Sequence, residues 1–287
     1  IEYTYPEVRI LKSIQGVAVA PIIDSLQVRV LSKGIELASS TPLNITSVSA
    51  NVLNDFSGSK RGTLGPLSRI LDLEKWDMPD LEIFMQRKQE LQANLAATKN
   101  TKEEQEGRLE LARFFFANAF APEALGVLRA MANQDPKIID SAEFRLLRGG
   151  ANYLMHRFTD AIEDLGHSSL DDIDEGAFWR AAVIAKSGEM MGAAQELQRT
   201  GAITESYPKQ LRIIMDTLVA DAIVSLGDTQ QGQEYIKTLK LVGLTNNQLA
   251  EVLFIEGKLL EIDGDEDAAL LKWEEVLETD NPPTRYK

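Results

Sequence analysis

Residues 257–269 read Gly257-Lys-Leu-Leu-Glu-Ile-Asp-Gly264-Asp-Glu-Asp-Ala-Ala269, two small residues twelve positions apart with a turn signal between them. This spacing of small residues occurs five times along the chain. The pairs are Ala112/Ala124, Gly149/Ala161, Ala181/Ala193, Ala220/Gly232 and Gly257/Ala269, and successive first members are 37, 32, 39 and 37 residues apart. A period of this length with two helical stretches per unit predicts a solenoid of stacked helix pairs.

The five units resemble the tetratricopeptide repeat over roughly residues 101–282. In that family a small residue on each of the two helices lets the pair pack closely, since bulk at the crossing would hold the helices apart. A glycine often ends the first helix with a positive φ, as Gly188, Gly227 and Gly264 would do here. Ala119 and His156 stand at that place in the first two units. A related helical-repeat class with the same spacing remains an alternative.

The resemblance also implies a groove for a peptide or partner helix, lined by the first helix of each unit. Carried over position by position, it predicts a row of aromatic and charged residues. The aromatic residues would anchor apolar side chains of a bound segment, and the charged residues would fix its register. The predicted groove residues are Arg113, Phe116, Tyr153, Phe178, Lys186, Asp221, Phe254, Lys258 and Glu261. The alternative is that the chain's own N-terminal strands or upstream sequence fill part of this surface.

The first fifty residues follow a different pattern. Residues 28–31 and 35–37 alternate around a turn at Lys33-Gly34 and predict a hairpin, with further strands expected at 8–11, 16–20 and 46–52. We therefore expect a small β-rich segment over 1–53, a loop or linker over 54–79 and a mainly α, repeat-built domain over 80–287. Within that domain the pattern predicts a helix from Asp80 to Ala97 and capping boxes at Thr101–Glu104 and Thr245–Gln248.

The net charge of −14 belongs entirely to the helical part, because residues 1–79 hold 8 acidic and 8 basic side chains and residues 80–287 hold 36 and 22. An acidic protein does not attract nucleic acid or anionic lipid. The longest apolar run, residues 16–23, is far too short to cross a membrane. We expect a neutral or basic protein partner and no direct membrane insertion; the oligomeric state stays open.

Signals for catalysis or metal binding are weak. The chain has no cysteine and only two histidines, His156 and His167, too few for a histidine zinc site. Residues 263–274 space carboxylates like a calcium loop, but Ala268 replaces the glycine that such a loop needs for its turn. The aromatic residues Phe114–Phe116 and Phe178-Trp179 are expected to be core. No catalytic residue, cofactor or metal is assigned.

The sequence thus predicts a non-catalytic scaffold for protein–protein assembly. The alternatives are a hydrolase using a carboxylate pair, as in glycosidases, and an architectural spacer whose groove is self-filled. Because the chain opens Ile1-Glu2-Tyr3, we expect it to be a piece of a longer polypeptide. The layout resembles large bacterial envelope proteins, and the absence of cysteine favours a periplasmic or otherwise extracytoplasmic location, with the cytoplasm as the alternative.

Overall fold

The computed structural model describes residues 3–4, 8–11, 18–22, 26–31, 34–39, 67–98 and 100–279. Two compact units, Ile1–Gly65 and Pro66–Lys287, divide the chain. Residues 67–79, which the sequence assigns to a linker, therefore belong to the helical unit.

The first unit contains short antiparallel strands. β1 (Tyr3–Thr4), β2 (Val8–Leu11) and β3 (Ala18–Pro21) form one sheet in that order, and β4 (Leu26–Leu31) pairs with β5 (Gly34–Ser39). Leu31 lies opposite Gly34, so the predicted hairpin is confirmed together with the strands near 8–11 and 16–20. The strand expected at 46–52 lies outside the described residues.

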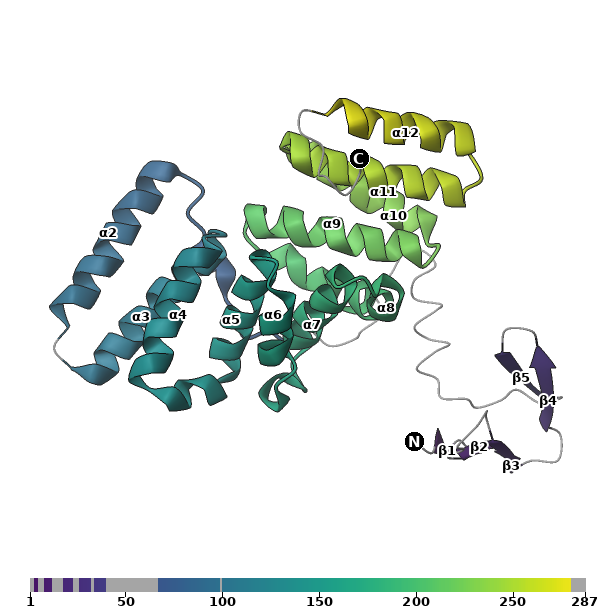
Figure 1. Ribbon diagram of the computed structural model, residues 1–287, viewed down its shortest axis with the longest axis horizontal. Helices are drawn as coiled ribbons and strands as arrows, with labels where there is room; N and C mark the ends of the chain where they lie inside the picture. Colours follow the sequence, from purple (N-terminus) through teal and green to yellow (C-terminus); the bar gives the residue numbers. More distant parts are fainter. Residues whose placement is uncertain are drawn as a thin grey trace. The chain divides into compact units, whose positions relative to one another are not determined.

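The second unit is a succession of helices, each packed on the next (Figure 1). A single helix, α2 (Leu81–Ala97), precedes five pairs. The pairs are α3 (Thr101–Ala117) with α4 (Ala121–Gln134), α5 (Ala142–Leu154) with α6 (Phe158–Leu165), α7 (Asp174–Lys186) with α8 (Met190–Thr200), α9 (Lys209–Ser225) with α10 (Thr229–Leu241), and α11 (Asn246–Ile262) with α12 (Glu266–Glu278). Short 3₁₀ turns occur at η1 (Leu73–Trp76), η2 (Pro136–Asp140), η3 (Ser168–Leu170) and η4 (Gly201–Ser206).

The small residues lie where the two helices of each pair cross, as the sequence predicts, and all ten are buried. A Cβ added to Gly149 would lie 2.6 Å from Cγ of Leu165 and 3.3 Å from the carbonyl oxygen of Ala161, both on α6. A Cβ on Gly232 would lie 2.6 Å from Cγ2 of Val224. Only small residues allow the helices to approach this closely.

One residue in the turn of every pair has a left-handed backbone, seven positions after the first small residue. The φ angles are 107°, 83° and 86° at Gly188, Gly227 and Gly264, and 61° and 56° at Ala119 and His156. The predicted turn glycines are confirmed. The two non-glycine residues adopt the same conformation, so the packing of the helix pair outweighs the cost of a Cβ in this region.

The helix starts follow capping chemistry. The capping box at Thr245 is confirmed, with the Thr245 side chain and Gln248 bonded to each other's backbone N–H groups. The capping box at Thr101 is wrong: Asn100 is the N-cap of α3, and its Oδ1 accepts from the N–H groups of Lys102 and Glu103. The amide oxygen of Asn100 thus takes the bonds that the Thr101 hydroxyl was expected to make.

Phe114, Phe115, Phe116, Phe178 and Trp179 are buried, as expected for core residues. One contiguous apolar core runs from Leu71 to Ile223, whereas smaller separate clusters link α9, α10 and α11 and, at the end, α11 and α12. The core therefore thins toward the last pair.

Candidate binding site on the first helices of the pairs

Residues 67–78, here termed the strap, pack against the first helices of the N-terminal pairs. Leu71, Leu73 and Trp76 of the strap are buried in the same core as Phe116 and Trp179. The strap therefore covers part of the surface on which the sequence predicts a groove.

The strap backbone is held by a buried carboxylate at the start of α7. Oε2 of Glu175 accepts from the N–H groups of Ile70 (2.9 Å) and Leu71 (3.0 Å). The N–H of Glu175 donates to the carbonyl oxygen of Ser68 at 3.1 Å. These bonds involve only backbone groups of the strap, so they do not depend on its side chains.

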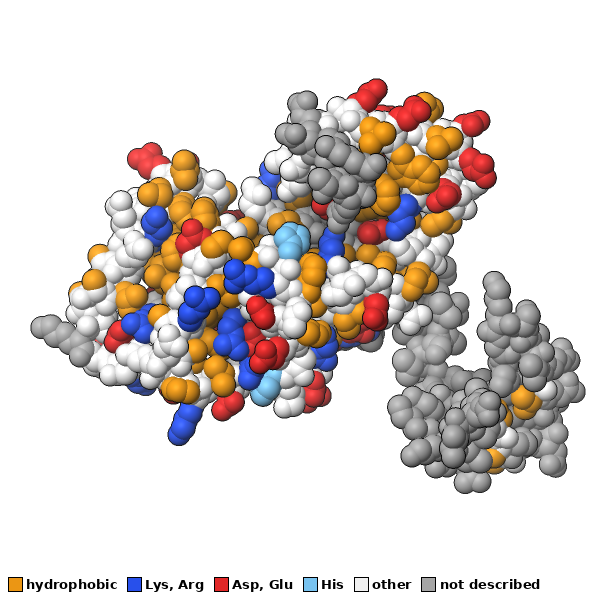
Figure 2. Space-filling view, in the orientation of Figure 1, with side chains coloured by type: hydrophobic (Ala, Val, Ile, Leu, Met, Phe, Trp, Pro, Cys, Tyr) orange, Lys and Arg blue, Asp and Glu red, His pale blue; other side chains and the backbone are white. Residues whose placement is uncertain are grey.

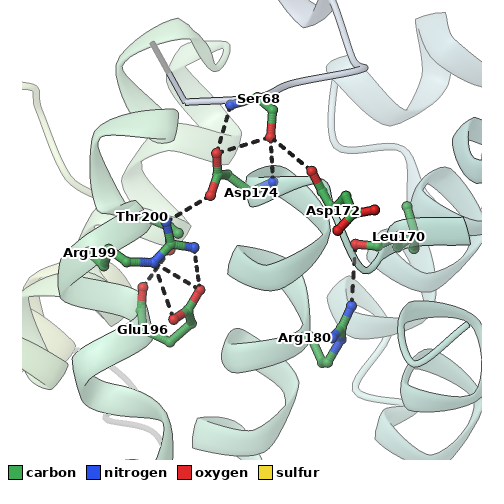
Figure 3. Close-up of polar contacts among 8 residues, drawn as sticks. All are labelled: Ser68, Leu170, Asp172, Asp174, Arg180, Glu196, Arg199 and Thr200. Carbon is green, nitrogen blue, oxygen red and sulfur yellow. Dashed lines mark hydrogen bonds and ion pairs between the residues drawn. The ribbon is translucent and has the colours of Figure 1, made fainter. Parts of the chain in front are cut away.

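Ser68 adds a contact that depends on its side chain (Figure 3). The N–H of Ser68 donates to Oδ2 of Asp174 at 2.8 Å, and the N–H of Asp174 donates to Oγ of Ser68 at 2.8 Å. Arg199 of α8 donates to the other oxygen of Asp174 at 2.7 Å and also pairs with Glu196. One arginine thus links α8 to the end of α7 that holds the strap.

Burial and hydrogen bonding set the charge state of these groups. Burial raises the pKa of Glu175, although N–H groups of the strap and the Tyr207 hydroxyl oppose this by donating to its carboxylate. Burial also raises the pKa of Tyr207, with the adjacent Glu175 adding to the shift. For Asp174 burial acts in the same upward direction, but bonds from Ser68 and Arg199 outweigh it and lower the pKa. Asp174 is the more firmly ionised of the two acids.

The far end of the strap is held by Asn118, the C-cap of α3. Its Nδ2 donates to the carbonyl oxygens of Trp76 and Phe114, both at 2.8 Å, and its Oδ1 accepts from the N–H of Met78 at 3.0 Å. The strap is therefore fixed to both the first and the third helix pair.

The predicted groove residues divide into two sets. Phe116, Tyr153 and Phe178 are buried, and the rings of Phe116 and Tyr153 lie 5.7 and 5.6 Å from that of Trp179. Their side chains stabilise the core and are not accessible to a partner. The remaining six, Arg113, Lys186, Asp221, Phe254, Lys258 and Glu261, keep exposed surface.

Two ion pairs join neighbouring first helices among the accessible residues. Arg113 forms a two-bond contact with Glu143, at 2.5 and 2.7 Å. Lys258 donates to Oδ1 of Asp221 at 2.5 Å and to Oγ of Ser225 at 3.1 Å. Phe254 is half-buried beside Trp273, whose Nε1 donates to the Phe254 carbonyl oxygen. Glu261 is exposed.

Sequence reasoning missed five residues that hold the strap: Ser68, Asn118, Asp174, Glu175 and Tyr207. None of the five was among the predicted groove residues, and their partners lie far away in the sequence; Ser68 and Asp174 are 106 positions apart.

The residues that the sequence considered for metal binding have structural roles in the part of the chain that the structure describes. Among the described residues no three His, Cys, Asp or Glu side chains are arranged to hold a metal ion. Asp265 N-caps α12, and residues 266–274 of the calcium-like stretch lie within that helix. His156 lies in a turn, as expected. Within the same part of the chain, no helix has the length and apolarity that crossing a bilayer requires.

Comparison with known proteins gives a likeness of structure but none of sequence. No protein-family model matches the sequence, and no curated protein matches it. The structure is similar to that of a tetratricopeptide repeat protein from Parabacteroides merdae, with a TM-score of 0.44 and 12% sequence identity, over 75% of this chain and 94% of that one. The five closely crossed helix pairs, with their left-handed turns, make the helical unit a tetratricopeptide-like solenoid.

Proposed function

We propose that this chain is a non-catalytic scaffold that binds a polypeptide partner through the first helices of its repeats. The observation that carries the proposal is the strap, a segment of the chain that α3 and α7 already hold by its backbone. The proposal assigns a partner to the first helices that the strap leaves uncovered.

The strap seat itself is closed to a partner. Burying Leu71, Leu73 and Trp76 contributes roughly 1.5–3 kcal/mol for each side chain. A tethered segment also competes at an effective concentration of the order of mM. A separate peptide would have to overcome both the buried apolar side chains and the tether. We therefore assign the partner to the part of the first helices that the strap does not cover.

We assign the partner to the accessible residues on α9 and α11. Phe254 offers an apolar anchor, while Asp221, Lys258 and Glu261 offer charges that fix the register of a bound segment. The chain's net charge of −14 favours a neutral or basic protein and disfavours nucleic acid.

Site-specific photo-crosslinking tests this assignment. A photoreactive residue at Glu261 of the full chain, in an extract of the source cells, should give an adduct of one discrete mass. The matched position Gln195, exposed on α8, should give none. Lys258→Glu, which reverses the charge beside Asp221, should weaken the Glu261 adduct. Equal crosslinking from both positions would contradict binding through this surface.

The strap favours a second function, that of an architectural spacer with a self-filled groove. In that case neither Glu261 nor Gln195 gives an adduct. The accessible residues on the first helices then serve only to join neighbouring helices, through pairs such as Asp221–Lys258. A screen for glycoside and peptide hydrolysis separates both functions from the hydrolase alternative, because scaffold and spacer predict activity no higher than background.

A further inference from the structure

The last helix pair exposes an apolar surface. Leu270, Leu271 and Leu277 of α12 are 56%, 59% and 57% exposed. Beside them lies a shallow hollow of about 240 Å³ lined by Phe254, Leu270, Trp273, Glu274, Val276 and Leu277. Leu270, Trp273 and Leu277 are spaced three and four residues apart, so they share one side of α12. We term this side, with the hollow, the end face.

The preceding pairs bury the position that Trp273 occupies. Leu128, Leu165, Leu197 and Ile236 stand four residues after the second small residue of their units, and all four are buried. The first helix of the following pair packs on each of these second helices. Trp273 has the same place in the last unit and is only half-buried. The end face therefore has the apolar chemistry of a helix-packing surface.

The surroundings of the end face are acidic. α11 has three carboxylates and α12 has five, against one lysine in each helix. Lys258 is engaged by Asp221, and Lys272 by Glu275 and Glu256. Glu266 and Glu274 lie four residues before and after Leu270, on the same side of α12. Figure 2 shows acidic side chains around the hydrophobic patch at this end of the helical unit.

We propose that the end face docks an amphipathic helix of a partner protein, with basic residues flanking its apolar stripe. The apolar stripe would cover Leu270, Leu277 and the hollow beside Trp273, as a following first helix covers the other pairs. Basic flanks complement the carboxylates, which orients the helix and speeds its association. A second copy of this chain is disfavoured as occupant, because it would bring the same acidic surroundings to the interface.

Two synthetic peptides of about 18 residues, or five helical turns, test the proposal. Both have the same Leu/Trp stripe; one has Lys and Arg beside it and the other has Glu. Fluorescence anisotropy with the full chain should show binding about tenfold or more tighter for the basic peptide, weakening as salt is added. The double variant Leu270→Gln/Leu277→Gln should lose this binding. Leu81→Gln, which replaces an exposed leucine on α2, should not.

Tryptophan fluorescence places the peptide. For this measurement the stripe is Leu/Phe, so the protein's tryptophans alone report. Trp76 and Trp179 are buried and Trp273 is half-buried, so docking on the end face should shift the emission to the blue, and Trp273→Phe should abolish the shift.

Four results would overturn the proposal. They are equal affinity for the two peptides, no effect of the double variant, a dimer in sedimentation that the double variant abolishes, and binding by a chain ending at Thr279 but not by the full chain. The third result assigns the end face to a second copy, and the fourth to the chain's own residues 280–287.

Discussion

The first three helix pairs and the last two have the same helix-pair backbone but different side chains on their first helices. At the equivalent position of the first helix stand Phe116 and Tyr153, both buried, and Glu261, which is exposed. The strap belongs to the core of the first three pairs and contributes no residue to the apolar clusters that join the last two. The repeat therefore sets the geometry of the helices, and the side chains on them decide whether a surface is buried in the core or accessible to a partner.

The buried apolar core also differs between the first three pairs and the last one. The core that includes the strap is continuous from Leu71 to Ile223, but the cluster between α11 and α12 consists of Ala250, Leu253 and Val276. A region with fewer buried apolar contacts opens at a lower free energy. We therefore expect the last pair to open first.

The largest effect should come from removing the strap's aromatic anchor. Trp76→Ala leaves a cavity in the first core and should lower the free energy of unfolding by about 3–5 kcal/mol. Native-state hydrogen exchange should show faster opening of α3, α5 and α7 with little change in α11 and α12. Leu81→Ala, on an exposed side chain, is the control. A uniform increase in exchange would show that the two regions form one cooperative unit.

Overpacking the helix crossings should also separate the regions. Gly149→Leu forces a side chain into Leu165 and the backbone of buried α6, and should cost about 3 kcal/mol. Gly257→Leu meets Trp273, whose ring is half-exposed and can move toward solvent, so about 1 kcal/mol is expected. Urea unfolding measures both. Gly192→Ala, with no atom near the added Cβ, should be neutral or slightly stabilising. Equal costs at the two glycines would contradict the difference in packing.

The pH dependence of the strap seat gives a smaller effect. The pKa of Glu175 is raised in the folded state, so its contribution to stability is greatest below the unfolded pKa of about 4.5 and falls as the pH rises through the folded value. Glu175→Gln keeps an oxygen that accepts from the strap N–H groups but does not ionise. The stability of this variant relative to the wild type should therefore increase as the pH rises from about 4 to 7.

Glu261→Gln, on an exposed side chain, controls for the loss of one negative charge. A pH profile of Glu175→Gln that does not differ from that of Glu261→Gln would contradict the raised pKa of Glu175.

The smallest effects should come from the turns. Ala119→Gly relieves a left-handed residue with a side chain, and the gain should be about 0.5 kcal/mol after the backbone entropy of glycine is subtracted. Gly264→Ala in the last pair should be destabilising by about 1 kcal/mol, since it creates the strain that Ala119 already bears. Thermal unfolding measures both changes. Stabilisation by each substitution would contradict a common turn geometry.

Much of the fold could be predicted because its signals are local and periodic. The small-residue pairs gave the register of five helix pairs, and Thr245 with Gln248 marked the start of α11. The strap could not be predicted in this way. Its residues have no period, and its recognition depends on Glu175 and Asp174, more than a hundred positions away. The sequence placed Phe116 and Tyr153 in a groove because a position in the repeat indicates which way a side chain points. It does not indicate which residues lie opposite that side chain.

The length of the loop that the strap closes also bears on synthesis. During translation the strap emerges before α7, and Asp174 follows Ser68 by 106 residues. Until α7 and Tyr207 leave the ribosome, Ile70 and Leu71 lack the helix end that anchors their segment. Contacts of such high sequence separation slow folding and prolong exposure of apolar surface. The N-terminal half of the nascent helical unit is therefore where a chaperone would be needed.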